Sequence, residues 1–339
     1  MTKKIKEKTY SDENELIFIR EKLLTLTSIC VKFDSPNANF CSYRLSLLSA
    51  ILISCELEND SQKTELILKT IIDKLFNEYI MFQSKYIEVE HTAPKNILKS
   101  IQNLKRQLAA NVLNICRKFS ANLKSFNEDI YYKSKFILKL IKLIYIYSII
   151  ILKGMSILNN EASTQIERVI FIQSLIYCSN ESNSYDAQCQ FIEQFISPIN
   201  TFFSTPDFQN ALQNVHVFIK YFGLGEEALM DPNNSTLQVR RQLFYYVNVM
   251  HSILKSVRNT EESTMESLEI QNLTNSGFLD IKTNRLKNPA FASYLKILEP
   301  ILGIIKSLNI LHSSELKSMV KTEYLEMTDS AKIMVLGKS

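Results

Sequence analysis

The apolar residues of this chain recur at intervals of three and four positions over nearly its whole length. That interval is the period of one face of an α-helix, and no stretch shows the two-residue alternation of a half-buried strand. Each predicted helix has one apolar face and is expected to bury it on a neighbour. The clearest apolar stripes are Ile97, Ile101, Leu104, Leu108, Val112, Ile115 and Phe119; Phe208, Leu212, Val215, Ile219 and Phe222; and Phe291, Leu295, Leu298, Leu302 and Ile305.

Turn-forming residues separate the predicted helices. Pro94 and Pro206 lie near helix starts, where proline is tolerated, and Gly223 follows a helix, as glycine commonly does. The polar stretch at about 260–288 is the longest predicted loop. The helices are predicted at 12–31, 40–56, 62–88, 96–120, 128–152, 164–180, 184–203, 207–222, 236–258, 289–310 and 313–336.

A long run of amphipathic helices with only 6 Gly and 7 Pro is typical of a stacked helical array. Since no fixed-period consensus appears, the pattern favours an all-α, HEAT-type α-α superhelix, which is a solenoid of antiparallel helix pairs. We expect N-terminal helical repeats at 1–91, central repeats at 92–258, a polar loop at 259–288 and a C-terminal helical hairpin at 289–339.

The composition is that of an ordinary globular protein, with 46% hydrophobic and 22% charged residues. The first eight residues are polar and basic, without the apolar core of a signal peptide, so we expect an intracellular protein. The six Cys show no Cys-x-x-Cys spacing, and most lie among apolar helical residues. They are interpreted as reduced thiols of the core.

The segment 136–152 is nearly all apolar and raises the question of a membrane. A membrane span needs about 20 residues with few charges. Lys139 and Lys142 interrupt this run, and Lys153 ends it. The length therefore favours a buried helix over a membrane-spanning or interfacial helix.

Positive charge is concentrated in one region of the chain. Residues 94–153 hold twelve Lys or Arg and two acids, a net +10 within a total of +4, so the remainder is at −6. Lys95, Lys99, Arg106 and Arg117 fall on one side of a predicted helix, opposite its apolar stripe. Such a stripe can neutralise phosphates, and it can equally be an ordinary solvated face.

Catalytic and metal-binding signatures are missing from the sequence. The four His have no partner at metal-ligand spacing, and no nucleophile or phosphate-binding motif occurs. We therefore expect a protein that is not an enzyme and takes no cofactor.

Several helical segments resemble, in the same order, the exportin-5 family of the importin-β (karyopherin) superfamily. The likeness covers about 92–337 and, more weakly, 62–82. The segments are Thr92-Ala93-Pro94 followed by SIQNLKRQLAANVLNICRKFS at 100–120, TQIERVIFIQSLIYCSN at 164–180, FIEQFISPINTFFSTPDFQNALQNVHVFIKYFG at 191–223, DPNNSTLQVRRQLFYYVNVMHSILKSV at 231–257, NPAFASYLKILEPILGIIKSLNILHSSEL at 288–316 and AKIMVLG at 331–337.

The resemblance implies a central-region segment of a nuclear export receptor. Such a receptor shuttles between nucleus and cytoplasm, passes nuclear pore proteins, binds Ran GTPase in its GTP form and carries structured RNA, such as microRNA precursors, or protein cargo. The candidate contacts to RNA or a partner are Lys95, Lys99, Lys105, Arg106, Arg117, Lys118, Arg240 and Arg241.

Three alternatives stay open at this point, and one of them is a membrane-associated protein that uses 136–152. Each candidate basic residue can instead pair with an acid of a neighbouring repeat and serve the structure. The whole chain can be a helical-repeat scaffold that binds only proteins and neither RNA nor Ran.

Overall fold

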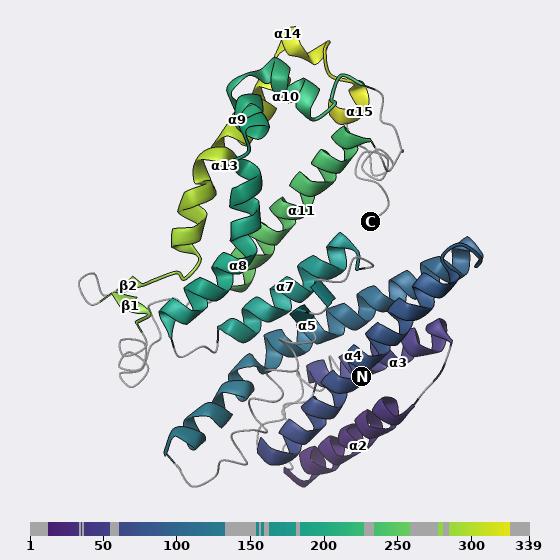
Figure 1. Ribbon diagram of the computed structural model, residues 1–339. Coiled ribbons are helices and arrows are strands. Elements are labelled where there is room, and N and C mark those ends of the chain that lie inside the picture. The colour runs from purple at the N-terminus through teal and green to yellow at the C-terminus, as the bar shows by residue number, and fades with distance from the viewer. Residues whose placement is uncertain are drawn as a thin grey trace. The chain divides into compact units, whose positions relative to one another are not determined.

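The computed structural model describes residues 13–33, 35, 37–54, 61–132, 154–155, 157–158, 163–180, 184–226, 234–257, 277–280 and 285–325. Almost all of these residues are helical, as Figure 1 shows, so the all-α prediction is confirmed. The chain divides into two compact units, Met1–Glu181 and Ser182–Ser339. The boundary between them falls inside the predicted segment 92–258, because the helices on its two sides pack onto different partners.

The first unit is built around its longest helix, α5, which contacts three other helices of the unit. The apolar stripe of α5 is buried from Ile101 to Phe119, while Ile97 at its start is exposed. The helices are α2 (Glu13–Lys32), α3 (Ala38–Ser54), α4 (Ser61–Val89), α5 (Lys95–Tyr132) and α7 (Gln165–Ser179). Helix α5 packs on α3, α4 and α7, and α2 packs on α3.

The second unit pairs α8 with α13 and also sets α11 against α8. Its helices are α8 (Tyr185–Phe203), α9 (Pro206–Gln213), α10 (Val215–Tyr221), α11 (Ser235–Ser256), α13 (Phe291–Leu311), α14 (Ser314–Lys317) and α15 (Thr322–Leu325). Most helices of both units contact the helix next to them in the chain, which is the local arrangement of a helical-repeat protein.

Aromatic rings form the centre of the second unit. The rings of Phe203 and Phe208 stack with centroids 5.0 Å apart, and Phe202 lies 5.1 Å from Phe208. Phe202 also contacts Tyr246 of α11, and Phe222 closes the cluster beside Phe208. Rings at these separations add attraction beyond the burial of their area, so this cluster joins four helices without charge.

Three predicted helix boundaries are wrong. The helix predicted at 207–222 breaks at Asn214, whose side chain accepts a hydrogen bond from the backbone N–H of His216 and starts α10. Helix α5 runs on through 128, where a new helix was expected, because 95–132 contains neither Gly nor Pro. In place of one continuous helix from 313, the described residues up to 325 form two short helices, α14 and α15.

The predicted polar loop also contains a minimal strand pair. Strands β1 (Leu279–Asp280) and β2 (Arg285–Leu286) pair antiparallel, with Leu279 opposite Leu286. Lys287 N–H donates to the carbonyl of Phe278 at 2.8 Å and extends the pairing by one bond. Two residues per strand are too few to produce a readable alternation, so the sequence pattern missed this pair.

The third apolar stripe named from the sequence is exposed, not buried. Leu295, Leu298 and Leu302 of α13 are each about half accessible to solvent, and Phe291 is 62% exposed. Helix α13 instead packs through Ile297, Ile304, Leu311 and two buried serines. The prediction of burial failed here because α13 is apolar on both sides. The apolar residues of each side recur at the same interval of three and four positions, so the pattern does not tell which side is buried.

Two further predictions concern the cysteines and the apolar segment 136–152. Five cysteines are described, none of them in a disulfide bond, and four of them are buried as predicted (Cys30, Cys41, Cys116 and Cys178). Among the described residues, no helix has the length and apolarity needed to cross a bilayer. The apolar segment 136–152 lies outside the described residues.

Candidate nucleic-acid interface

Helix α5 presents most of the predicted basic residues, and the structure sorts them by accessibility. The helix starts after Pro94, whose carbonyl accepts the backbone N–H groups of Ile97 and Leu98. With the apolar stripe held against α3, α4 and α7, the opposite side meets solvent. Lys95, Lys99, Arg117 and Lys118 are exposed, and Arg106 is half-buried.

The exposed cations form an elongated surface and not a pocket. Lys95 and Arg117 lie 22 positions apart in α5, which corresponds to about 33 Å along a helix and a difference in direction of about 40°. Lys99 lies one turn from Lys95, on the same side. A single small anion cannot touch both ends of this surface, whereas an extended polyanion can.

Lys105 is the exception on α5, because it is almost fully buried. Its Nζ lies 3.3 Å from Oε2 of Glu167 in α7, and both side chains are at most 2% exposed. The ammonium also lies 5.5 Å from the ring centroids of Tyr79 and Tyr86 in α4. The pair therefore links α5 and α7 and is packed beneath α4.

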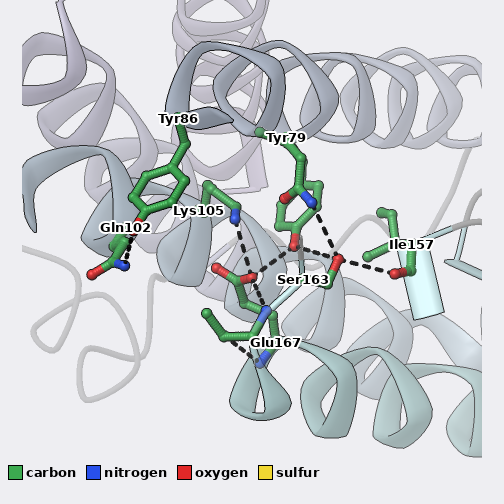
Figure 2. A network of polar contacts seen from close by, with 9 residues as sticks. Tyr79, Tyr86, Gln102, Lys105, Ile157, Ser163 and Glu167 are labelled. Carbon is green, nitrogen blue, oxygen red and sulfur yellow. Dashed lines mark hydrogen bonds and ion pairs between the residues drawn. The ribbon is translucent and has the colours of Figure 1, made fainter. Parts of the chain in front are cut away.

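Figure 2 shows that Glu167 is the centre of this network. Its Oε2 accepts a hydrogen bond from the Tyr79 hydroxyl at 2.9 Å and another from the Thr164 backbone N–H at 3.0 Å. The Thr164 side chain in turn accepts from the Glu167 backbone N–H at 3.3 Å. This reciprocal arrangement is a capping box, so the same carboxylate starts α7 and holds Lys105.

A second layer of polar contacts surrounds the carboxylate. Ser163 donates to the carbonyl of Ile157 at 2.9 Å and lies 3.5 Å from the Tyr79 hydroxyl. On the other side of Lys105, Gln102 donates to the hydroxyl of Tyr86 at 2.8 Å. The network thus includes residues of α4, α5, α7 and the segment before α7, all within the first unit.

Electrostatics agree with a structural role for this network. Burial lowers the pKa of the Lys105 ammonium below its ordinary value, and the Glu167 carboxylate opposes that shift. Burial, together with the Glu167 charge, raises the pKa of Tyr79 well above its ordinary range, so the phenol stays protonated and donates. Breaking such a buried pair leaves a charge without compensation.

Arg240 of α11 is the second buried candidate. Its Nη1 donates to the carbonyl of Phe222 and lies 3.4 Å from the Thr236 hydroxyl. Its guanidinium carbon lies 5.3 Å from the ring centroid of Tyr324 in α15. Burial lowers the pKa of Arg240 from its ordinary value. Its neighbour Arg241 is half-buried.

Gly223 allows Arg240 to take this position. Its φ is 60°, in the left-handed region that favours glycine. A Cβ at this residue would lie 2.6 Å from Oγ1 of Thr236 and 3.1 Å from Nη1 of Arg240. The chain therefore needs glycine here both for the backbone conformation and for space.

Lys105 and Arg240 thus carry the alternative, structural role that the sequence left open, and they are not available at the surface. Among the candidates, the exposed residues are Lys95, Lys99, Arg117 and Lys118. Sequence reasoning missed the two partners, Glu167 and Tyr79. The pattern Thr164-x-x-Glu167 is a capping-box signal that could have located the acid.

Helices that pack on their neighbours along the chain are the architecture of a helical-repeat protein. The chain belongs to the exportin-5 family, whose model matches residues 1–339. It is 25% identical over 305 residues to Exportin-5 of Homo sapiens, and 24% identical over 302 residues to Exportin-5 of Mus musculus. Each alignment covers 85% of this chain and 22% of the relative, so the chain spans about a fifth of the length of these curated relatives.

Proposed function

We propose that this chain is a segment of a nuclear export receptor that carries structured RNA. The observation that carries the proposal is the family match over residues 1–339, which brings the chain together with two proteins named exportin. The name describes transport and not catalysis, and a binding role needs no active site. By family, the further partners are Ran GTPase in its GTP form and nuclear pore proteins, with shuttling between nucleus and cytoplasm.

The exposed side of α5 is the surface we assign to RNA. Lys95, Lys99 and Arg117 line up along the helix, with Lys118 beside them and Arg106 partly accessible between them. Double-stranded RNA presents regular phosphates and 2′-hydroxyls, which a row of cations contacts without reading bases. Binding should therefore favour structured RNA over any particular sequence and weaken steeply with salt.

The test removes three exposed charges from α5 and measures binding to a hairpin RNA over a range of salt concentrations. Changing Lys95, Lys99 and Arg117 together to Ala should lower the affinity. It should also reduce the slope of log affinity against log salt by roughly one unit for each phosphate that the variant no longer neutralises. Because these side chains are exposed and Ala favours helix, the helix content should stay the same.

A matched variant separates this surface from general charge. Lys255, Lys317 and Lys321 are exposed cations of the second unit, and changing all three to Ala removes the same net charge. This control should keep most of the affinity. Equal binding by the wild type and both triple variants would instead favour the scaffold that binds only proteins.

A further inference from the structure

Helix α3 carries the most exposed aromatic side chains among the described residues of the first unit. Tyr43 is 76% exposed and Phe40 is 61% exposed. They are three positions apart, so they lie on one side of the helix, and the exposed Leu47 follows on the same side. We call Phe40 and Tyr43 the α3 aromatic pair. Aromatic side chains grouped on an exposed helix side are typical of a binding surface.

Helix α3 lies beside α5 and runs in the same direction. The hydroxyl of Ser42 donates to Oε1 of Gln107 in α5 at 2.7 Å, and the two helices pack on each other. Nearer the two helix starts, Asn39 of α3 and Ser100 of α5 line the same cavity. The later residue of α3 therefore meets the later residue of α5, which is the arrangement of a parallel pair.

The side of α3 that carries the aromatic pair lies opposite the core. Ser42 faces α5. Tyr43, one position further along, lies about 100° around the helix from Ser42, and Cys41, one position back, lies equally far around in the other sense. Cys41 is 1% exposed, so these two directions point toward solvent and toward the core.

Helix α5 has the same two directions in the reverse order. Gln107 faces α3, and Leu108, one position further along, is fully buried. Arg106, one position back, lies about 100° around the helix toward solvent, in line with the exposed Lys99. Parallel helices that face each other must turn in opposite senses to reach the same side. The aromatic pair and the basic surface of α5 therefore share one open face.

Along this face the aromatic pair is level with the middle of the basic surface. Ser42 and Gln107 are 65 positions apart in the chain. With that offset, Phe40 and Tyr43 are level with positions of α5 that lie between Lys99 and Arg117. The two rings therefore have exposed cations before and after them on the same face.

The charge of this face selects the kind of molecule that can cover the rings. Helix α3 contains no acid, and α5 contains none from Lys95 to Asn127. A face with cations and without carboxylates attracts a polyanion. Aromatic rings set among cations are the arrangement by which proteins hold single-stranded nucleic acid, whose bases stack on the rings. Only unpaired bases are free to do so, because the bases of a duplex are not splayed out.

We propose that Phe40 and Tyr43 stack on unpaired bases of an RNA whose phosphates lie along the basic surface of α5. The ligand of this face is then a duplex interrupted by a few unpaired nucleotides, and the identity of those bases matters little because every base has a face that can stack. The inference rests on the proposed function, since it needs RNA on α5.

Two RNA hairpins with the same stem test this proposal. One is fully paired, and the other carries a few unpaired adenosines in the stem, one of them replaced by the fluorescent base 2-aminopurine. Wild-type protein should bind the interrupted hairpin more tightly and quench its fluorescence by stacking. Phe40→Leu with Tyr43→Leu should weaken binding of the interrupted hairpin by about tenfold and abolish the quenching. Binding of the paired hairpin and the slope against salt should not change, because no phosphate contact is lost.

Two further variants separate stacking from general effects. Tyr43→Phe keeps the ring and should behave like the wild type. Phe291→Leu on α13 is the matched control, since Phe291 is 62% exposed and Phe40 61%, and it should change neither binding nor quenching.

The outcomes distinguish this proposal from the proposed function. If the double Leu variant weakens both hairpins equally, or weakens neither, the stacking proposal is wrong. An effect on neither hairpin would assign the aromatic pair to a protein partner. In both cases a loss of paired-hairpin binding in the triple Ala variant of α5 would still support RNA on the basic surface. If the wild type binds neither hairpin, both proposals fail.

Discussion

The two units of this protein both pack aromatic rings between helices, but they differ in how deeply the ion pairs between their helices are buried. In the first unit, two buried ion pairs join neighbouring helices, Arg44–Glu78 between α3 and α4 and Lys105–Glu167 between α5 and α7. In the second unit, the aromatic cluster around Phe208 occupies the centre. The ion pair between α8 and α13 there, Glu193–Lys296, is partly exposed at 2.7 Å.

The contrast shows that the same helical-repeat architecture can depend on very different physical terms. A buried pair contributes little net stability while intact, but losing one partner is costly because the other charge stays buried. An aromatic cluster leaves no buried charge behind when one ring is lost, since its attraction comes from buried apolar area and from the packing of the rings. The first unit should therefore respond strongly to the loss of one charge, and the second should respond to a reduction in side-chain volume.

The largest effect should come from Lys105→Met, which leaves the Glu167 carboxylate buried without its cation. We expect the free energy of unfolding of the first unit to fall by about 3–5 kcal/mol. Native-state hydrogen exchange of α4, α5 and α7 measures this locally. Lys99→Met, at an exposed position of the same helix, should change it by less than about 0.5 kcal/mol.

Neutralising the partner sharpens this test. In the Lys105→Met background, Glu167→Gln removes the stranded charge and keeps an oxygen for Tyr79 and Thr164. More than half of the lost stability should return. If Lys105→Met is as mild as Lys99→Met, the two units do not differ in the way proposed.

A smaller effect is expected from Phe208→Leu in the second unit. Leu fills most of the volume but cannot stack on the rings of Phe202 and Phe203. The free energy of unfolding of this unit should fall by about 1–1.5 kcal/mol. Because no charge is involved, chemical denaturation should show the same decrease at pH values between about 5 and 8. A decrease that varies with pH over that range would show that charge is coupled to the cluster.

The smallest effect should come from Glu193→Gln at the partly exposed pair. Burial raises the pKa of Glu193, but hydrogen bonds from Lys296 and Ser293 outweigh it, and the net pKa lies below the ordinary value of 4.5. The pair therefore stabilises the folded state above about that pH. Its contribution is lost as the pH falls through the lowered folded-state pKa, because the unfolded carboxyl takes up its proton first.

At neutral pH, Glu193→Gln should lower the free energy of unfolding by less than about 1 kcal/mol, because partly exposed ion pairs contribute little. The difference between wild type and variant should shrink toward zero on acidification to about pH 3. Denaturation curves of the second unit at a series of pH values measure it. A difference that grows on acidification would contradict the assigned sign.

The sequence predicted the helices well because their apolar stripes are long and periodic. It was less successful where a single residue ends one helix and starts the next. Asn214 is such a residue, because its side chain caps α10 and divides a continuous apolar pattern into α9 and α10. On α13 the pattern could not say which of two apolar sides is buried, since that depends on which helices lie nearby.

The candidate site was predicted in part. Lys105 was predicted as a contact to RNA or a partner, although it lies four residues after Ile101 and three before Leu108, in line with buried positions of α5. The sequence could not supply its partner, because Glu167 lies 62 positions further along the chain. Lys95, Lys99 and Arg117 were placed correctly on the solvent side, since they lie opposite the stripe.

Gly223 has a consequence for how natural variation in this chain should be interpreted. Every residue that a single base change can introduce at a glycine codon carries a Cβ, and a Cβ here would collide with Thr236 and press on Arg240. A missense variant at this codon would misplace the start of α11, which is a different helix from the basic surface of α5. An organism carrying it should contain less of the protein, and the RNA binding proposed for α5 should be unaltered in the molecules that survive.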